Sequence, residues 1–442
     1  MRRSNLSEGV IRTNMEMTLD GKICGMKMCK LGDLCSDVVD CPHSTPEWKN
    51  EGIRVIRNFN IVNGSLDFSN GFFVDEETFE KRTQRACPEF EDLVISREAP
   101  MGAVCMIPKN LKCCLGQRLV LLKVNKDVAD PNYILFAIQS QFVQKQIQII
   151  DQTGSIVSNL NIPDLKSLRI PLPSLPEQKK IASVLSALDD KIALNKKMNQ
   201  KLEAMAKRLY DYWFVQYDFP DKNGRPYKTT GGPMTYNPIL KREIPAGWEV
   251  SSFTDFGFFK NGINYDKNEI GDETVKIVNV RNISDSTTYF NIDELDDITL
   301  KSDDIQKFVA TPKDILLARS GSPGATRLLP QTDKKIIYCG FIIRYQLNEQ
   351  DLDKQLYLFH VLKGYEQVTS TQSAGSILKN ISQDTLNALM VVMPQSSVLD
   401  AFNKKIAPIY SMLRKNICEL NKLTALRDKL LPLLMNGQVE IK

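Results

Sequence analysis

The sequence predicts an α+β protein in which two similar strand-rich domains are joined by two long helices packed as an antiparallel coiled coil, with a pseudo-two-fold internal repeat. Three observations carry this prediction. The stretch from Pro176 to Trp213 has no glycine, has no further proline, and repeats apolar residues with helical periodicity. The second half of the chain repeats the first at a shift of about 222 residues. Short β-branched runs broken by Gly, Pro, Asn and Asp precede both copies of the helix.

The first long helix carries a seam of apolar positions spaced by fours and threes. This spacing is typical of a helix that packs against another helix. At 1.5 Å per residue the helix runs roughly 55 Å, more than a domain of this size needs, so we interpret it as a spacer. Ser174 and Glu177 predict a capping box at its start. The predicted seam consists of Ile181, Leu185, Leu188, Ile192, Asn195, Leu202, Leu209 and Trp213.

The repeat supplies the partner of this helix. At a shift of 222, residues 92–97 fall on 314–319, and Gly102-Ala103 falls on Gly324-Ala325. At a shift of 221, the triplet at 154–156 meets the same triplet at 375–377. An antiparallel pairing is favoured, although a linker of this length could also span a parallel one. We expect Asn195 and Asn416 to fix the register. The second seam consists of Phe402, Ile406, Ile409, Leu413, Asn416, Leu420, Leu423, Leu430 and Leu434.

These patterns predict the division of the chain. A tail over 1–21 is followed by a domain over 22–173, a spacer helix over 174–214 and a linker over 215–245. A second domain over 246–394, a second spacer helix over 395–436 and a tail over 437–442 complete the chain. The linker is expected to be irregular because proline and glycine are frequent in it. One helix is expected inside the first domain, from Tyr133 to about Ile147.

The composition argues against a strongly basic protein, a disulfide-bonded protein and a membrane protein. The 442 residues are 42% hydrophobic and 25% charged, with a net charge of +4, so any nucleic-acid contact must come from local patches. The ten cysteines form no CxxC pair, which predicts reduced thiols and a cytoplasmic protein. Four of them, Cys24, Cys29, Cys35 and Cys41, cluster near His43, but zinc ligands usually lie closer in pairs, and we predict no metal site. No signal peptide or membrane span is expected.

No catalytic motif is found. The chain has no Pro-Pro dipeptide, which the adenine-methyltransferase tetrapeptide requires, and no GxxxxGK[ST] loop for nucleotide phosphates. Of the two histidines, His360 aligns near Phe136 in the repeat and is expected in the core, whereas His43 lies in a polar loop. We therefore predict a non-catalytic protein.

Two similar domains related by a pseudo-two-fold axis suit the two-fold pseudosymmetry of a DNA duplex, and basic side chains are the candidates for contact with it. Arginine and lysine bind phosphates, and arginine can read guanine by a bidentate bond. Arg97 and Arg319 occupy equivalent places in the repeat, each after a strand and before a small-residue loop. An ordinary solvated charge or an ion pair inside the domain is the alternative for each. The basic residues predicted to bind DNA are Arg54, Arg57, Arg82, Arg97, Lys276, Arg281, Arg319 and Arg327.

Three segments resemble the specificity subunit of Type I restriction–modification systems. They are the run Pro171-Leu172-Pro173-Ser174-Leu175-Pro176-Glu177-Gln178, the linker from Tyr217 to Trp248, and the C-terminal stretch from Leu426 to Gly437. Together with the repeat, the resemblance covers nearly the whole chain. The second helix departs from it, because Gln395-Ser396-Ser397 stands where the first copy has Pro-Glu-Gln.

The resemblance implies two target-recognition domains that each read half of a split double-stranded DNA sequence. The loop with His43, Ser44 and Thr45 resembles polar loops of this family, so these three residues are also predicted to bind DNA. The resemblance also implies two modification subunits that bind S-adenosylmethionine and methylate adenine, and restriction subunits that use ATP and Mg to cut DNA. This chain is then expected to hold no cofactor. Two alternatives stay open: an architectural coiled-coil tether with two protein-binding domains, and a self-contained methyltransferase or nuclease.

Overall fold

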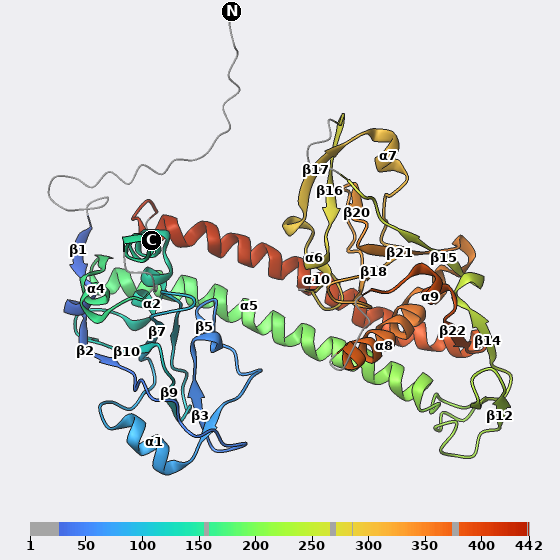
Figure 1. Ribbon diagram of the computed structural model, residues 1–442, viewed down its shortest axis with the longest axis horizontal. Helices are drawn as coiled ribbons and strands as arrows, with labels where there is room; N and C mark the ends of the chain where they lie inside the picture. Colours follow the sequence, from blue (N-terminus) through green and yellow to red (C-terminus); the bar gives the residue numbers. More distant parts are fainter. Residues whose placement is uncertain are drawn as a thin grey trace, which may run out of the picture. The chain divides into compact units, whose positions relative to one another are not determined.

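The computed structural model describes residues 26–153, 159–265, 271–284, 286–373, 380–439 and 441 (Figure 1). The chain divides into two compact units. One contains the residues up to Ala193 and those from Lys422 onwards, and the other is Leu194–Asn421. Each unit combines several small sheets with helices, and the predicted α+β fold class with an internal repeat is confirmed.

The first unit is built on a four-stranded antiparallel sheet in the order β2-β10-β7-β8. A three-stranded sheet, β6-β3-β9, pairs β3 antiparallel to β6 and parallel to β9. The remaining strands pair as β1-β11 and β4-β5. The strands are β1 Lys27–Lys30, β2 Cys35–Asp40, β3 Ile53–Ile56, β4 Ile61–Val62, β5 Ser65–Leu66, β6 Phe73–Val74, β7 Leu93–Ser96, β8 Val104–Met106, β9 Cys113–Leu115, β10 Leu119–Val124 and β11 Arg169–Leu172.

The second unit repeats this topology. Its four-stranded sheet has the order β15-β21-β18-β19, and its three-stranded sheet, β17-β16-β20, again has one antiparallel and one parallel pair. The pair β14-β22 matches β1-β11, and a hairpin, β12-β13, is added. The strands are β12 Met234–Asn237, β13 Arg242–Pro245, β14 Glu249–Ser252, β15 Gly257–Asn261, β16 Glu273–Val278, β17 Asp296–Leu300, β18 Ile315–Ala318, β19 Thr326–Leu328, β20 Ile336–Tyr338, β21 Ile342–Leu347 and β22 Met390–Met393.

The repeat extends to backbone detail. Strand β7 and strand β18 are related by the shift of 222 that the sequence predicts. The loop after each strand contains a glycine with positive φ, Gly102 at 82° and Gly324 at 87°, a conformation that favours glycine. The amide of Gly102 donates to Ser96 O and that of Gly324 to Ala318 O. The repeated triplets at 154–156 and 375–377 lie outside the described residues.

The shorter helices differ between the repeats. The prediction of one helix from Tyr133 to Ile147 is wrong, because the chain forms two helices interrupted at Ser140, whose backbone is extended (φ −63°, ψ 149°). The equivalent segment of the second unit is a single helix, α8. The shorter helices are α1 Glu76–Thr83, α2 Pro131–Gln139, α3 Gln141–Thr153, α4 Ile162–Ser167, α6 Val280–Ser284, α7 Ser302–Gln306, α8 Gln355–Ser373 and α9 Gln383–Asn387, with 3-10 turns at Leu31–Leu34, Asn58–Asn60, Phe253–Asp255, Ile292–Glu294 and Glu349–Lys354.

The two long helices are α5, Leu175–Tyr210, and α10, Ser396–Met435. They pair antiparallel within each unit. In the first unit Ile181 and Leu185 share a core with Leu434, and in the second unit Leu202 shares one with Phe402. At the start of α5, the Glu177 carboxylate accepts from the amide (2.9 Å) and the hydroxyl (2.7 Å) of Ser174. A π-helical turn, Asp211–Val215, follows α5.

The segment expected to be an irregular linker is folded. It contains the β12-β13 hairpin, and its Phe219 ring stacks between Tyr227 (centroids 4.5 Å apart) and Trp248 (5.0 Å). The Asp218 carboxylate accepts from the amide and hydroxyl of Thr229. These contacts join the segment to the core of the second unit.

Candidate nucleic-acid interface

Two predicted arginines of the first unit lie among aromatic rings. Arg54, on β3, lies 4.5 Å from the ring centre of Phe68 and 5.0 Å from that of Phe73. Arg57 lies 4.8 to 5.6 Å from the rings of Phe72, Phe59 and Trp48. We call this group the aromatic loop: Trp48, Arg54, Arg57, Phe59, Phe68, Phe72 and Phe73. Neither arginine has an ion pair among the described residues, and Nη1 of Arg54 is buried and has no hydrogen-bond partner there.

A second group surrounds Asp40 at the end of β2. Nη1 of Arg97 donates to both oxygens of the Asp40 carboxylate, at 2.9 and 2.8 Å. The exposed ring of His43 lies 3.2 Å from the same carboxylate. Nε of Arg97 also donates to Leu160 O at 3.0 Å. The positive charge of Arg97 is therefore compensated inside its own domain.

Arg82 has a structural role in this conformation. It is buried on α1, and its guanidinium donates to Leu115 O at 3.1 and 2.8 Å. It also donates to Ser44 O (2.9 Å) and Pro42 O (3.2 Å). The same loop carries His43, Ser44 and Thr45, all of which are exposed. Arg82 thus holds the backbone of the loop that presents these three predicted contact residues.

The predicted cations of the second unit have mostly acidic partners. Nζ of Lys276 lies 2.9 Å from Asp297, and Arg281 pairs with Asp296. Arg319, in the loop after β18, is half-buried, and its side chain has no hydrogen bond or ion pair within the described part of the chain. Next to it in the fold lies Phe341, whose side chain is 62% exposed and whose backbone carbonyl accepts from Arg319 N.

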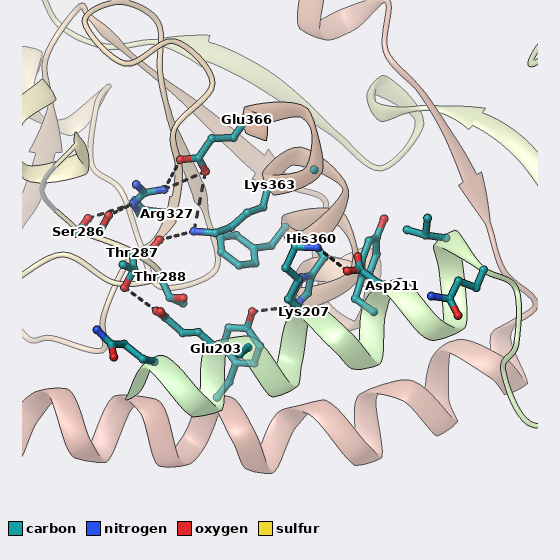
Figure 2. A pocket seen from close by; sticks show the side chains of 18 residues that line it. Glu203, Lys207, Asp211, Ser286, Thr287, Thr288, Arg327, His360, Lys363 and Glu366 are labelled. Atoms are coloured by element: carbon teal, nitrogen blue, oxygen red, sulfur yellow. Dashed lines mark hydrogen bonds and ion pairs between the residues drawn. The ribbon is translucent and has the colours of Figure 1, made fainter. Parts of the chain in front are cut away.

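Arg327 lines a cavity of about 760 Å³ in the second unit (Figure 2). It is 4% exposed, and Nη1 lies 3.1 and 3.2 Å from the two oxygens of Glu366. Nζ of Lys363 donates to Thr287 O, and the Thr287 hydroxyl donates to Glu203 at 2.6 Å. Burial, and then the charge of Arg327, lower the pKa of Lys363 to about 8. Figure 2 shows Arg327 held by Ser286 and Glu366 at the cavity wall, so its charge is compensated.

The cavity wall also contains the second histidine. His360 is 7% exposed, and its Nε2 lies 3.0 Å from the hydroxyl of Tyr410. Its ring stacks on Tyr210, with centroids 4.9 Å apart. Burial, followed by the charges of Lys363 and Lys207, lowers the pKa of His360 to about 3. A histidine that is neutral and packed among rings is a core residue.

The predicted seam residues all lie at buried or partly buried positions of the two long helices. Asn195 is 4% exposed, and its Nδ2 donates to Glu419 at 3.2 Å. Nδ2 of Asn416 is buried and has no partner within the described residues. Buried are Ile181, Leu185, Ile192, Asn195, Leu202, Trp213, Phe402, Ile406, Leu413 and Leu434; partly buried are Leu188, Leu209, Ile409, Asn416, Leu420, Leu423 and Leu430.

The sequence reasoning missed the aromatic rings around Arg54 and Arg57. The signal was the density of phenylalanines between residues 59 and 73, in a stretch that lacks helical or strand periodicity. It also missed Asp40, which lies 57 positions from Arg97 along the chain. In the part of the chain that the structure describes, which excludes Cys24, no group of three or more acidic, histidine or cysteine side chains could hold a metal ion. No helix among the described residues combines the length and apolar character that a membrane span needs.

Comparisons with known proteins agree with one another. Residues 24–204 match the family described as Type I restriction modification DNA specificity domain. The Type I restriction enzyme MjaIX specificity subunit of Methanocaldococcus jannaschii is 26% identical over 374 residues, which cover 84% of this chain and 82% of that protein. The HindI specificity subunit of Haemophilus influenzae is 21% identical over 384 residues, covering 74% and 81%.

A solved structure shares the fold. The S subunit of a Type I restriction–modification system from M. genitalium covers 94% of this chain and 97% of its own, with a TM-score of 0.57 and 16% identity. The match extends over both repeats and both long helices. Residues 24–204 thus match the DNA specificity domain of Type I restriction–modification systems, and most of the chain is similar in sequence to specificity subunits of these systems.

Proposed function

We propose that this chain recognises a bipartite sequence in double-stranded DNA, each strand-rich domain reading one half. The observation that carries the proposal is the repeat: two domains with one topology, joined by helices that pair antiparallel within each unit. A protein with two similar readers suits a target with two half-sites, whose spacing follows from the separation of the readers.

The chain supplies recognition, and its partners supply the chemistry. Two modification subunits bind S-adenosylmethionine and methylate adenine, and restriction subunits cleave DNA with ATP and Mg; all of them dock on this chain in the cytoplasm. The names of the relatives, which are specificity subunits, support this role. Predicted target-recognition domains over 22–173 and 246–394, with spacer helices over 174–214 and 395–436, are the parts that this function needs.

The test uses the full chain purified together with its modification subunit. Methylated adenines mapped in the host genome, with the gene present and deleted, define the target. A duplex with that target is expected to bind at least about a thousandfold more tightly than a scrambled duplex, the usual lower limit for specific recognition. A complex that methylates no defined sequence, and prefers no duplex, contradicts the proposal and favours the architectural tether.

The long helices act in this proposal as a spacer. Seven residues inserted in α5 after Ala193, together with seven in α10 after Asn421, keep the heptad pattern and add about 10 Å. At about 3.4 Å per base pair, the gap between the half-sites is expected to grow by about three base pairs. Methylome mapping of the variant reads this out directly. A methylated target with an unchanged gap excludes the spacer role.

A further inference from the structure

Among the predicted DNA-binding residues, the cations without an acidic partner lie at different places in the two domains. Strands β3 and β16 are equivalent at a shift of 222, so Arg54 corresponds to Lys276 and Arg57 to Asn279. In the first unit these positions are surrounded by rings. In the second unit carboxylates surround them: Lys276 pairs with Asp297, and Nδ2 of Asn279 donates to Asp296 at 2.9 Å.

The reverse holds in the loops after β7 and β18. In the first unit Arg97 is bound by Asp40, and the neighbouring Arg118 pairs with Glu98 at 3.0 Å. In the second unit every acidic member of this group has been replaced. In the first unit, Asp40 on β2 pairs with Val120 on β10. The corresponding pair in the second unit is Asn261 on β15 with Ile343 on β21, so Asn261 occupies the position of Asp40. Ser320 stands in place of Glu98 at the shift of 222. Phe341 stands in place of Arg118, because its carbonyl accepts from Arg319 N as the carbonyl of Arg118 accepts from Arg97 N.

The surroundings decide which cations can bind a phosphate. A cation that already has a carboxylate partner must give up that partner to bind a phosphate, which reduces the net gain. A guanidinium packed against a ring uses its face, and this contact does not occupy the N–H donors at its edge, which can bind phosphate oxygens or guanine O6 and N7. Nη1 of Arg54 is buried and unpaired, so binding DNA through it breaks no existing hydrogen bond but requires the side chain to move. Arg54, Arg57 and Arg319 therefore differ from Arg97, Lys276 and Arg281 in the charge that they can offer to DNA.

We infer that the two domains bind their half-sites through different loops: the first through Arg54 and Arg57 of the aromatic loop, and the second through Arg319 in the loop after β18, whose backbone pairs with that of the exposed Phe341. This inference rests on the proposed function. The repeat alone would give equivalent positions the same role in DNA binding. The inference instead assigns DNA contact to Arg54 and not to Lys276, and to Arg319 and not to Arg97. Lys276 and Arg97, at the equivalent positions, keep their side chains in ion pairs within the domain.

The experiment measures DNA affinity of the complex with the modification subunit over a range of salt concentrations. For the double variant R54Q/R57Q we expect affinity to fall about tenfold or more and the salt slope to shrink by about two, because two phosphates are no longer neutralised. The matched variant K276Q, at the position equivalent to Arg54, is expected to change affinity less than about twofold. For R319Q we expect affinity to fall several-fold and the slope to shrink by about one.

A second set of duplexes assigns each arginine to a half-site. When the half-site read by the first domain is mutated, the R54Q/R57Q complex is expected to lose less DNA affinity than the wild-type complex does. When the other half-site is mutated, the two complexes are expected to lose the same affinity. R118Q, which removes a cation paired with Glu98, is the control for R319Q. Thermal melting excludes unfolded variants, and R54K/R57K, which keeps the charge, is expected to recover part of the salt slope.

The outcomes separate this inference from the proposed function. A wild-type complex that prefers no duplex contradicts the function itself. A wild-type complex that binds its target, but in which K276Q weakens binding as much as R54Q/R57Q, overturns the inference alone. The same holds if R118Q weakens binding as much as R319Q, because compensated cations would then contribute equally.

Discussion

The hydrophobic cores of the two units can be compared position by position, because both are built on the same strand order. In each unit a buried tyrosine of the helix after the central sheet donates its hydroxyl to the last strand: Tyr133 to Pro171 O at 2.6 Å, and Tyr357 to Val392 O. Three residues beyond, the first unit has Phe136 and the second has His360. Backbone pairing has thus been kept while the side chains that fill the core have diverged.

The second core is also the more aromatic. Phe402 packs edge to face on Phe214 with centroids 4.8 Å apart, and Trp213 and Trp248 lie in the same cluster. The residue equivalent to Phe402 at a shift of 221 is Ile181 in the first unit, packed among aliphatic side chains. The comparison indicates that the two units differ in what stabilises them, and three experiments can sharpen or break it.

The largest effect is expected from Phe402→Ala. Phe402 is fully buried, so its removal leaves a cavity and is expected to lower the free energy of unfolding of the second unit by about 3–5 kcal/mol. Ile181→Ala, at the equivalent place, is expected to cost the first unit about 2–3 kcal/mol. Hydrogen exchange followed by mass spectrometry resolves the two units. Leu194→Ala, at an exposed site of α5, is the control and should cost under about 0.5 kcal/mol. Equal losses of stability for Phe402→Ala and Ile181→Ala contradict the comparison.

The next effect is a difference in acid stability. Because the pKa of His360 falls to about 3 in the fold, against 6.5 in the unfolded chain, the unfolded state binds the extra proton between these values. Stability of the second unit is therefore complete above pH 6.5 and falls as the pH drops towards 3. At pH 5 this residue lowers the free energy of unfolding by about 2 kcal/mol. Urea unfolding followed by tryptophan fluorescence reports it, since Trp213 and Trp248 lie in this core.

The first unit provides the control substitution for this effect. His360→Phe places in the second core the residue that the first core has at Phe136, and should abolish this part of the pH dependence. The variant also removes the hydrogen bond between His360 and Tyr410, so its stability at about pH 8 is the reference for its own titration. If acid destabilises the second unit of His360→Phe as much as that of the wild type between pH 6.5 and pH 3, His360 is excluded as the source of the pH dependence.

Sequence reasoning reached the features that depend on periodicity and on the repeat. The long helices, the strand-rich character of both domains and the core position of His360 all followed from patterns along the chain. It could not reach features that depend on which side chain lies opposite in the fold. Arg97 and Arg319 look equivalent in sequence, but only the strand register shows that Asn261 occupies the position of Asp40, the carboxylate that binds Arg97. The buried position of Arg82 likewise depends on carbonyls brought together from two loops.

The smallest effect concerns the polar positions of the helix pair. Asn195 and Asn416 are equivalent at a shift of 221, but Asn195 donates to Glu419 while Nδ2 of Asn416 has no partner among the described residues. At the same shift, the position equivalent to Glu419 is Met198. The thioether of methionine is only a weak hydrogen-bond acceptor. Asn195→Ala is expected to cost about 1–2 kcal/mol in urea unfolding, and Asn416→Ala under about 0.5 kcal/mol.

Met198→Glu tests why the two asparagines differ. If the missing carboxylate is the reason, this substitution gives Asn416 an acceptor, and Asn416→Ala then becomes costly. The double-mutant cycle of Met198→Glu with Asn416→Ala is expected to give a coupling free energy of about 1 kcal/mol, comparable with that between Asn195 and Glu419. A coupling near zero would mean that the two halves of the helix pair differ in packing and not only in this one residue. The asymmetry would then lie in the backbone register of the helices.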